Sequence, residues 1–190
     1  MSGHGFHVHG PHDHAVEHGS QSGDNFASRI AVMTAVLSTV GALFSYSGGA
    51  TQNDAMLMKN AAAIKKTEAA NQWNYYQAKS NKQNLAELSV SLSPDANKAK
   101  YQQDVERYRA EKAEIKTAAE KLEAESKAFE QKSDDAMHLH HRWAQAMTAI
   151  QIAISLAAIS LLTRKKWLNY ATGLAAGLGV VLGGAALAHL

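Results

Sequence analysis

The sequence has no cysteine and only two prolines in its 190 residues. Without cysteine the chain has no disulfides, no thiolate metal ligands and no thiol nucleophile. The second proline is Pro94, and no glycine occurs between Gly49 and Gly173. Because proline and glycine are the strongest helix breakers, the middle of the chain predicts long helices with one interruption near Pro94.

Asp, Glu, Lys, Arg and His are missing from three apolar stretches, residues 30–47, 144–163 and 168–188. A helix rises about 1.5 Å per residue, so about 20 apolar residues cross the hydrocarbon core of a bilayer. The sequence therefore predicts an all-α membrane protein with three transmembrane helices, with the lipid bilayer as its first partner. The absence of acidic and basic groups from these spans argues against a proton-coupled transporter.

The residues between the first two spans, 48–143, predict a soluble helical hairpin. Ser, Pro and Asp in the segment 91–95 favour a turn there. The helical arms on either side, Thr51–Leu92 and Asp95–Trp143, have about 42 and 49 residues, or about 63 and 73 Å. Arms of such similar length are expected to return the chain to the same membrane surface.

A seven-residue repeat predicts that these arms form an antiparallel coiled coil. In the second arm the repeat consists of large side chains with small or polar companions four residues later. These are Tyr101, Tyr108, Ile115, Leu122, Phe129, Ala136 and Trp143, with Val105, Lys112, Ala119, Ser126, Ser133 and His140. On the first arm, the residues expected to form the other side of the seam are Leu57, Ile64, Asn71, Ala78, Leu85 and Leu92. Because asparagine weakens such a seam, we expect a homo-oligomer in which copies support one another.

Two sets of residues are candidate interfaces with a subunit or an unknown protein partner. The first set places aromatic rings and amides around a whole helix circumference: Asn71, Gln72, Trp73, Tyr75 and Tyr76. Packing within the chain explains this set equally well. The second set consists of two Gly-x-x-x-Gly pairs in the last span: Gly173, Gly177, Gly179 and Gly183. Small residues at this spacing let membrane helices approach closely.

The first of these sets lies in the stretch ANQWNYYQAKS, residues 70–80, which is followed by Lys82 and Leu85. This stretch resembles the QW-x-YYQAKS signature of a bacterial membrane family, the domain of unknown function numbered 4337. The likeness covers about residues 25–185 and extends to the order of segments: a span, the signature helix, a charged helix and a hydrophobic end. The resemblance implies a bacterial membrane protein and brings no activity or catalytic residues with it.

Residues 1–29 predict a disordered, histidine-rich head. It carries the candidate metal ligands His4, His7, His9, His12, His14 and His18. Neutral imidazoles bind Zn(II), Ni(II) or Cu(II), and removal of Met1 leaves Ser2-Gly3-His4, a start that suits square-planar Cu(II) or Ni(II). A polar tail without a metal role is the alternative. Asp134, His138 and His141 share a helix face and form a weaker candidate metal site.

No catalytic constellation or dinucleotide fingerprint is present, so we expect no enzyme, no catalytic residue and no cofactor-binding residue. The net charge of +2 gives no indication of nucleic acid binding. The leading hypothesis is a homo-oligomeric, membrane-anchored coiled-coil scaffold or assembly protein of the bacterial envelope. The alternatives are a metal-handling protein that uses the histidine-rich head, and a channel-like or stator-like oligomer. The basic loop at residues 164–167 predicts a multi-pass inner-membrane protein with a periplasmic hairpin.

Overall fold

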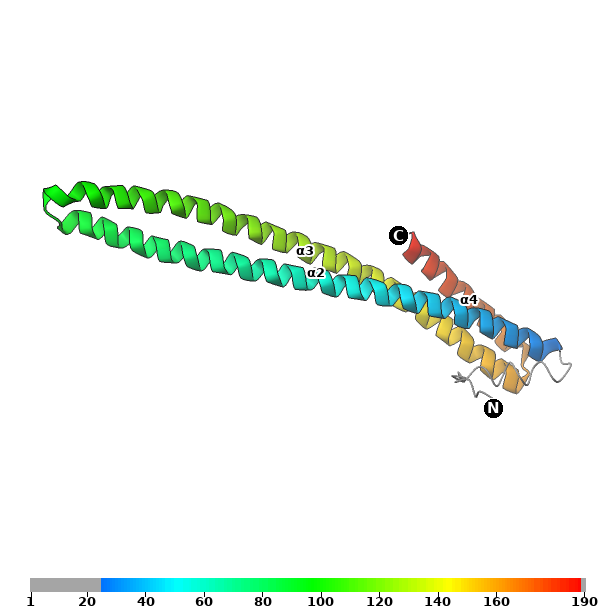
Figure 1. Cartoon of the computed structure of the whole chain (residues 1–190). Coiled ribbons are helices and arrows are strands. Elements are labelled where there is room, and N and C mark those ends of the chain that lie inside the picture. Colours follow the sequence, from blue (N-terminus) through cyan, green and yellow to red (C-terminus); the bar gives the residue numbers. More distant parts are fainter. Residues whose placement is uncertain (1–24, 189–190) are drawn as a thin grey trace, which may run out of the picture. The chain divides into compact units, whose positions relative to one another are not determined.

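The computed structural model describes residues 25–188, and every regular element in this part of the chain is a helix. The helices are α2 (Asn25–Leu92), α3 (Asp95–Thr163) and α4 (Lys166–Leu187) (Figure 1). Each contains a stretch that is long and apolar enough to cross a membrane. The all-α class predicted from the sequence is therefore correct. The histidine-rich head lies outside the described residues, apart from its last positions.

The helix boundaries follow from local chemistry. Between α2 and α3 only Ser93 and Pro94 are outside a helix, and this is where the sequence predicts a turn. After Thr163, Arg164 has φ 53°, a left-handed conformation that commonly ends helices. The backbone N–H of Arg164 donates to the carbonyl of Ser160 at 2.9 Å. Helix α4 begins at Lys166, so the connection consists of Arg164 and Lys165 and is shorter than the predicted loop at 164–167.

Helix α2 does not stop where the first predicted span ends. Two glycines, Gly48 and Gly49, follow directly after the predicted span, and α2 runs through both without a break. Gly48 is buried, and a Cβ atom placed on it would lie 3.3 Å from Cβ of Trp143. Its carbonyl accepts a hydrogen bond from Nδ1 of His140 at 2.8 Å, which fixes the proton on Nδ1. Close contact between helices, and not the end of a helix, explains the glycine at position 48.

The described chain divides into two compact units. The three-helix unit comprises residues 25–53 and 136–188, and the two-helix unit comprises residues 54–135. The core of the three-helix unit contains Leu37, Ile150, Ala153 and Ile154. Its helices meet through small residues, with Ala146, Ala149, Ala153 and Ala157 of α3 all buried. The Ala149–Ala153–Ala157 repeat in the sequence therefore lies at a contact between helices.

The outer surface of the three-helix unit is apolar. Large aliphatic side chains point outward on all three helices, among them Val36, Leu43, Ile152, Leu178 and Val181. No more than 39% of the most apolar stretch of any of these helices is buried. Threonine and serine hydroxyls in these stretches donate to the carbonyl four residues earlier, as Thr148 does to Ala144 and Ser155 does to Gln151. Hydroxyls satisfied in this way are compatible with lipid.

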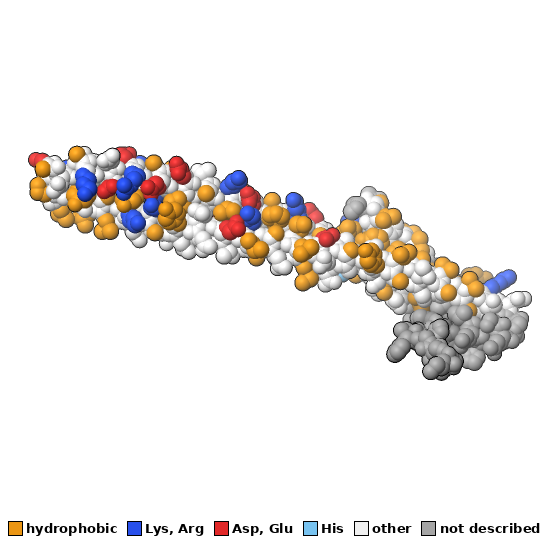
Figure 2. Space-filling model, in the orientation of Figure 1, with side chains coloured by type: hydrophobic (Ala, Val, Ile, Leu, Met, Phe, Trp, Pro, Cys, Tyr) orange, Lys and Arg blue, Asp and Glu red, His pale blue; other side chains and the backbone are white. Residues whose placement is uncertain are grey.

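In the two-helix unit, residues 54–92 of α2 and 95–135 of α3 lie side by side and run in opposite directions (Figure 1). Ser126 contacts Ala62, and Ser133 contacts Ala55, so each step of seven residues along one helix matches a step of seven back along the other. Figure 2 shows charged side chains over this unit and few over the helices of the other.

Candidate interaction site

The contact between α2 and α3 in the two-helix unit begins with alanine and serine. Ala55, Ala62 and Ala69 of α2 are buried at intervals of seven, and Ala119 of α3 has no exposed surface. The Ser126 hydroxyl donates to the carbonyl of Ala62 at 2.9 Å. The Ser133 hydroxyl donates to the carbonyl of Ala55 at 2.8 Å. A side-chain bond to the backbone of the facing helix is possible only because alanine lets the helices approach closely.

The predicted α3 half of this seam is correct, because Val105, Ile115 and Ala119 are buried with Ser126 and Ser133. The predicted α2 half is wrong. The exposed fraction is 55% for Leu57, 59% for Ile64 and 64% for Leu85, and Asn71, Ala78 and Leu92 are exposed as well. Helix α2 contacts α3 through the column that starts at Ala55, two positions earlier. The large aliphatic column was assigned to the seam because it has the same period of seven.

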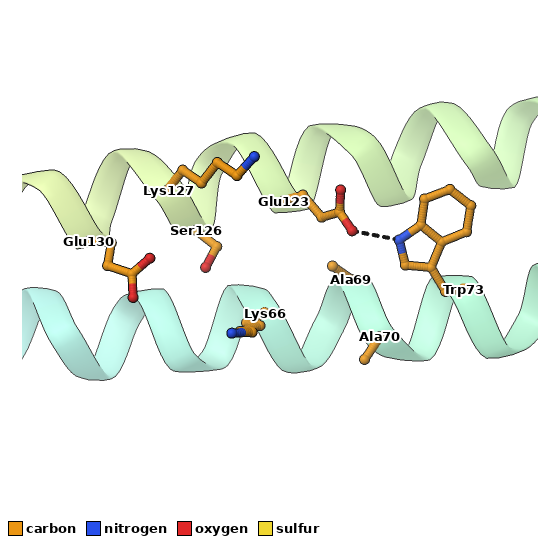
Figure 3. Close-up of a pocket in the computed structure, with 8 residues that line it drawn as sticks. All are labelled: Lys66, Ala69, Ala70, Trp73, Glu123, Ser126, Lys127 and Glu130. Atoms are coloured by element: carbon orange, nitrogen blue, oxygen red, sulfur yellow. Dashed lines mark hydrogen bonds between the residues drawn. The ribbon is translucent and has the colours of Figure 1, made fainter.

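Further along the seam, aromatic rings replace the alanines. The indole Nε1–H of Trp73 donates to Oε1 of Glu123 at 2.8 Å, and Figure 3 shows this bond joining α2 to α3. The Trp73 and Tyr76 rings meet edge to face, with 5.6 Å between centroids. The Lys112 ammonium lies 4.9 Å from the centroid of Tyr76 and bonds to the Gln83 amide oxygen at 3.2 Å.

An ion pair between Lys79 and Glu111 follows the aromatic cluster, with 2.5 Å between Nζ and Oε2. The hydrogen bond to Glu111, and then that to Tyr75, raises the pKa of Lys79. The same bond to Lys79 lowers the pKa of Glu111, with smaller contributions from the charges of Lys79, Arg107 and Lys82. The Lys79 ammonium also lies 5.6 Å from the ring centroid of Tyr108. Because the pKa of Lys79 is raised and that of Glu111 is lowered, the Lys79–Glu111 pair is charged throughout the neutral pH range.

A groove beside the Trp73–Glu123 bond is lined by side chains of both helices (Figure 3). The lining residues are Lys66, Ala69, Ala70, Trp73, Glu123, Ser126, Lys127 and Glu130. The Ser126 hydroxyl is committed to the Ala62 carbonyl, so it is not placed as a nucleophile beside a base. Glu123 holds the indole N–H. These contacts join α2 to α3.

The predicted aromatic and amide set is divided between two sides of α2. Gln72, Trp73 and Tyr76 are partly buried, and the latter two make the contacts with α3 described above. Asn71 and Tyr75 are exposed. Packing within the chain thus accounts for the ring of Trp73 and that of Tyr76, and leaves the outward residues available to a partner.

The four glycines of α4 are divided in the same way. Gly179 and Gly183 are buried: a Cβ on Gly179 would lie 2.8 Å from Cδ1 of Ile150, and one on Gly183 would overlap the Phe44 ring. The Phe44 ring in turn lies 5.4 Å from the Trp143 ring, centroid to centroid. Gly173 and Gly177 are exposed, with no atom within 4 Å of an added Cβ. Only the first Gly-x-x-x-Gly pair therefore remains open to another chain.

Residues 25–188 contain no group of three or more histidine, aspartate or glutamate side chains placed to hold a metal. Asp134, His138 and His141 therefore do not form such a group. His141 instead lies beside His140, with ring centroids 5.7 Å apart. The six candidate ligands from His4 to His18 lie outside the described residues.

Sequence reasoning missed the residues that hold the two-helix unit together. Glu123 was not singled out as a partner of Trp73, nor Glu111 as a partner of Lys79. The alanine column at Ala55, Ala62 and Ala69 has a clear period of seven in the sequence. Attention to small residues at that period, and not only to large ones, would have located the seam.

Comparisons with known proteins give one finding. A family model described as Domain of unknown function (DUF4337) matches residues 26–189, which include all three helices and both units. No curated protein and no solved structure matches the chain. The match covers most of the chain and agrees with the resemblance carried by the motif around Trp73. The chain is a member of the DUF4337 family.

Proposed function

We propose that the protein is a homo-oligomeric, membrane-anchored coiled-coil scaffold of the bacterial envelope. The three-helix unit is the anchor, with membrane spans at residues 30–47, 144–163 and 168–188. The two-helix unit is an antiparallel coiled-coil hairpin that stands in water and presents a rigid surface to other proteins. No catalytic step is part of this proposal.

The observation that carries the proposal is the outward position of the large aliphatic side chains in the three-helix unit. Val36, Leu43, Ile152, Leu178 and Val181 would expose a broad apolar surface to water if the unit were soluble. The helices use alanine and glycine for their mutual contacts, as helices in lipid commonly do. A bilayer is the medium that such a surface fits.

Two features support assembly of several copies. Gln151 is exposed near the middle of the second span, on the same side of α3 as Thr148 and Ser155. An amide in hydrocarbon is stabilised by a hydrogen bond to a neighbouring helix. Gly173 and Gly177 are open on α4. A second copy of the chain supplies partners for both.

The orientation follows from the basic sequence Arg164-Lys165-Lys166 between the last two spans. Basic residues in short loops stay in the cytoplasm, so the hairpin belongs to the periplasm of an inner-membrane protein. A cysteine replacing Asp95 should react with an impermeant thiol reagent in intact spheroplasts, and one replacing Ser20 should not. The reverse pattern would place the hairpin in the cytoplasm.

Native mass spectrometry of the detergent-extracted protein tests the scaffold proposal. Each chain has a mass of 20.4 kDa, and we expect a closed assembly at a fixed multiple of it. Gln151→Leu should lower the assembled fraction, whereas Ile152→Leu at the neighbouring exposed position should not. A stable monomer in mild detergent, with its helices intact, would overturn the proposal.

Metal handling by the head is a separate hypothesis, which the six histidines between His4 and His18 favour. If the free amine of Ser2 is a ligand, Cu(II) should give the visible band of square-planar nitrogen coordination. Acetylation of that amine should abolish the band. Deletion of residues 2–18 with no change in the copper, nickel or zinc tolerance of the cell would remove the physiological hypothesis.

A further inference from the structure

The two helices of the two-helix unit differ sharply in charge. Residues 95–135 of α3 include 20 charged side chains, whereas residues 54–92 of α2 include eight. The eight are Asp54, Lys59, Lys65, Lys66, Glu68, Lys79, Lys82 and Glu87. Three of them form ion pairs with α3: Lys59 with Glu130, Lys65 with Glu125, and Lys79 with Glu111. The side of α2 away from α3 is left without charge.

This side of α2 forms a continuous surface, which we name the neutral face. It consists of three neighbouring columns with a period of seven: Met56, Ala63, Ala70, Gln77, Asn84 and Ser91; Leu57, Ile64, Asn71, Ala78, Leu85 and Leu92; Asn60, Thr67, Asn74, Asn81 and Leu88. All 17 residues are exposed and none carries a charge. Because seven residues make two helical turns, the residues of each column lie on one side of the helix. These three columns lie on the side opposite the column that starts at Ala55.

An exposed, uncharged helix face of this length is unusual for a surface that remains in water. Soluble coiled coils place charged residues on their outer positions, as α3 does. Figure 2 shows most of the charged side chains in view toward α3, with orange and white atoms along the α2 edge. The exposed fraction of Leu88 is 53% and that of Leu92 is 76%. A partner that covers the neutral face would remove these apolar groups from water.

We propose that the neutral face of α2 binds the neutral face of a second copy of the chain, as a parallel, in-register coiled coil. This inference rests on the proposed membrane anchor, because two copies held in one membrane by the same helix point the same way. In register, each layer meets itself: Leu57 meets Leu57, Ile64 meets Ile64 and Asn74 meets Asn74 of the second copy. The pairing extends from residue 56 to 92, about five heptads, which exceeds the three to four heptads that define a coiled coil.

The charges are compatible with this partner. In a parallel pair, the columns that flank the contact face one another across it, and like charges there oppose association. The column from Met56 to Ser91 forms one edge of the neutral face and has no charge, so Glu68 and Lys82, which lie beside the other edge, meet only uncharged residues of the second copy. Asparagine layers at Asn71, Asn74 and Asn81 reduce stability but select one register and orientation. Each chain has one neutral face, so this contact makes a dimer.

A single thiol tests the pairing, since the sequence contains no cysteine. In membranes containing the full-length protein, Asn74→Cys should form a disulfide-linked dimer on mild oxidation, because the two side chains meet in the same layer. Ala124→Cys, exposed on α3, is the matched control and should remain monomeric on the same gel. Equal crosslinking at the two sites, or none at Asn74, would overturn the inference.

Charge complementation tests the register independently. Ala78→Glu places a carboxylate four residues before Lys82, which is a favourable spacing within one helix, so α2 should remain helical by circular dichroism. Two copies of this variant repel each other at one layer, and the dimer should be lost. Co-expression with the Ala78→Lys variant should restore the dimer, and Ala124→Glu should leave it intact.

The outcomes separate this inference from the proposed function. If the native protein assembles and Ala78→Glu assembles equally well, the neutral face is not the contact, and the scaffold proposal survives through its membrane helices. If Ala78→Glu dissociates and the Ala78→Lys variant does not rescue it, the in-register pairing is wrong. If the native chain is itself a monomer, both proposals fail. Should Ala78→Glu lose its helicity, the Asn74→Cys crosslink decides.

Discussion

The three-helix unit and the two-helix unit both use small residues to bring their helices into close contact. They differ in the side chains that surround those contacts. In the three-helix unit, Gly183 receives the Phe44 ring and Gly179 receives Ile150. In the two-helix unit, alanines face serines whose hydroxyls reach the opposite backbone. Ion pairs such as Lys79–Glu111 flank the second contact. In both units, placing small residues inside leaves large aliphatic residues outside; we propose lipid as their surroundings in the first unit and a second copy of the chain in the second.

The largest expected effect is at Gly183, where glycine meets an aromatic ring. Gly183→Leu should disrupt the three-helix unit, because even a Cβ at this position overlaps Phe44. We expect a loss of at least about 1–3 kcal/mol, the usual cost of overpacking a core. Gly184→Leu is the control, since a Cβ at this neighbouring position meets no atom within 4 Å. Thermal unfolding in detergent measures both. Equal midpoints would mean that α4 does not pack as described.

Overpacking should have a comparable but smaller effect in the two-helix unit. Ala119 has no exposed surface, whereas the adjacent Ala118 is exposed. Ala119→Leu should separate α2 from α3 and destabilise the unit by about 1–3 kcal/mol. Ala118→Leu should change the stability by only a few tenths of a kcal/mol or less. Denaturant titration followed by Trp73 fluorescence, in a chain with Trp143 and Trp167 replaced by Phe, measures the difference. A larger effect at Ala118 would place the seam on another face of α3.

A single hydroxyl tests the close approach of the helices. Ser126→Ala removes the bond to the Ala62 carbonyl and should cost about 0.5–1.5 kcal/mol. Thr117→Ala is the control, because the Thr117 hydroxyl bonds only to its own helix at Ala113. That change should be neutral or slightly stabilising, since alanine has the higher helix propensity. If both changes have the same effect in denaturant titrations, the serine does not join the two helices.

The smallest expected effect is the pH dependence of the Lys79–Glu111 pair. The pKa of Glu111 lies below its ordinary value of 4.5, so its contribution is present above that pH and is lost on acidification through the lowered pKa. The pKa of Lys79 lies above 10.5, so its contribution is complete below that pH and is lost as pH rises through the raised pKa. The stability difference between the native chain and Lys79→Met should therefore be constant from about pH 5 to pH 10. Thermal melts across this range should show a gap that narrows below pH 4. A gap that widens on acidification would contradict the pairing.

The sequence predicted the helices well because the relevant signals are local. Charge-free length marked the three apolar stretches, and Pro94 marked the one interruption between Gly49 and Arg164. The heptads of α3 were assigned to the correct side because charges occupy its other positions. The same reasoning failed on α2, where the column from Ala55 and the column from Leu57 both repeat every seven residues. Period alone cannot choose between two faces, and size suggested the wrong one.

The glycines were misinterpreted for a related reason. Gly48 and Gly49 have the composition of a helix end, but the side chain that faces Gly48, that of Trp143, is distant in sequence. The two Gly-x-x-x-Gly pairs in α4 are alike in sequence, and only tertiary contacts distinguish the pair that receives Phe44 and Ile150 from the open pair. The partners of Trp73 and Lys79 on α3 depend on the relative register of the two helices, which no local pattern determines.

The rate at which single thiols react with an impermeant reagent tests the central claim, that three outer faces meet three different surroundings. Leu43→Cys should be protected by lipid, and Ala124→Cys should react rapidly in water. Asn74→Cys should react slowly under reducing conditions in the assembled protein, and as fast as Ala124→Cys once Ala78→Glu separates the copies. All three positions are exposed within a single chain. Rapid reaction of Leu43→Cys would contradict the membrane anchor, and rapid reaction of Asn74→Cys in the assembled protein would contradict the paired neutral faces.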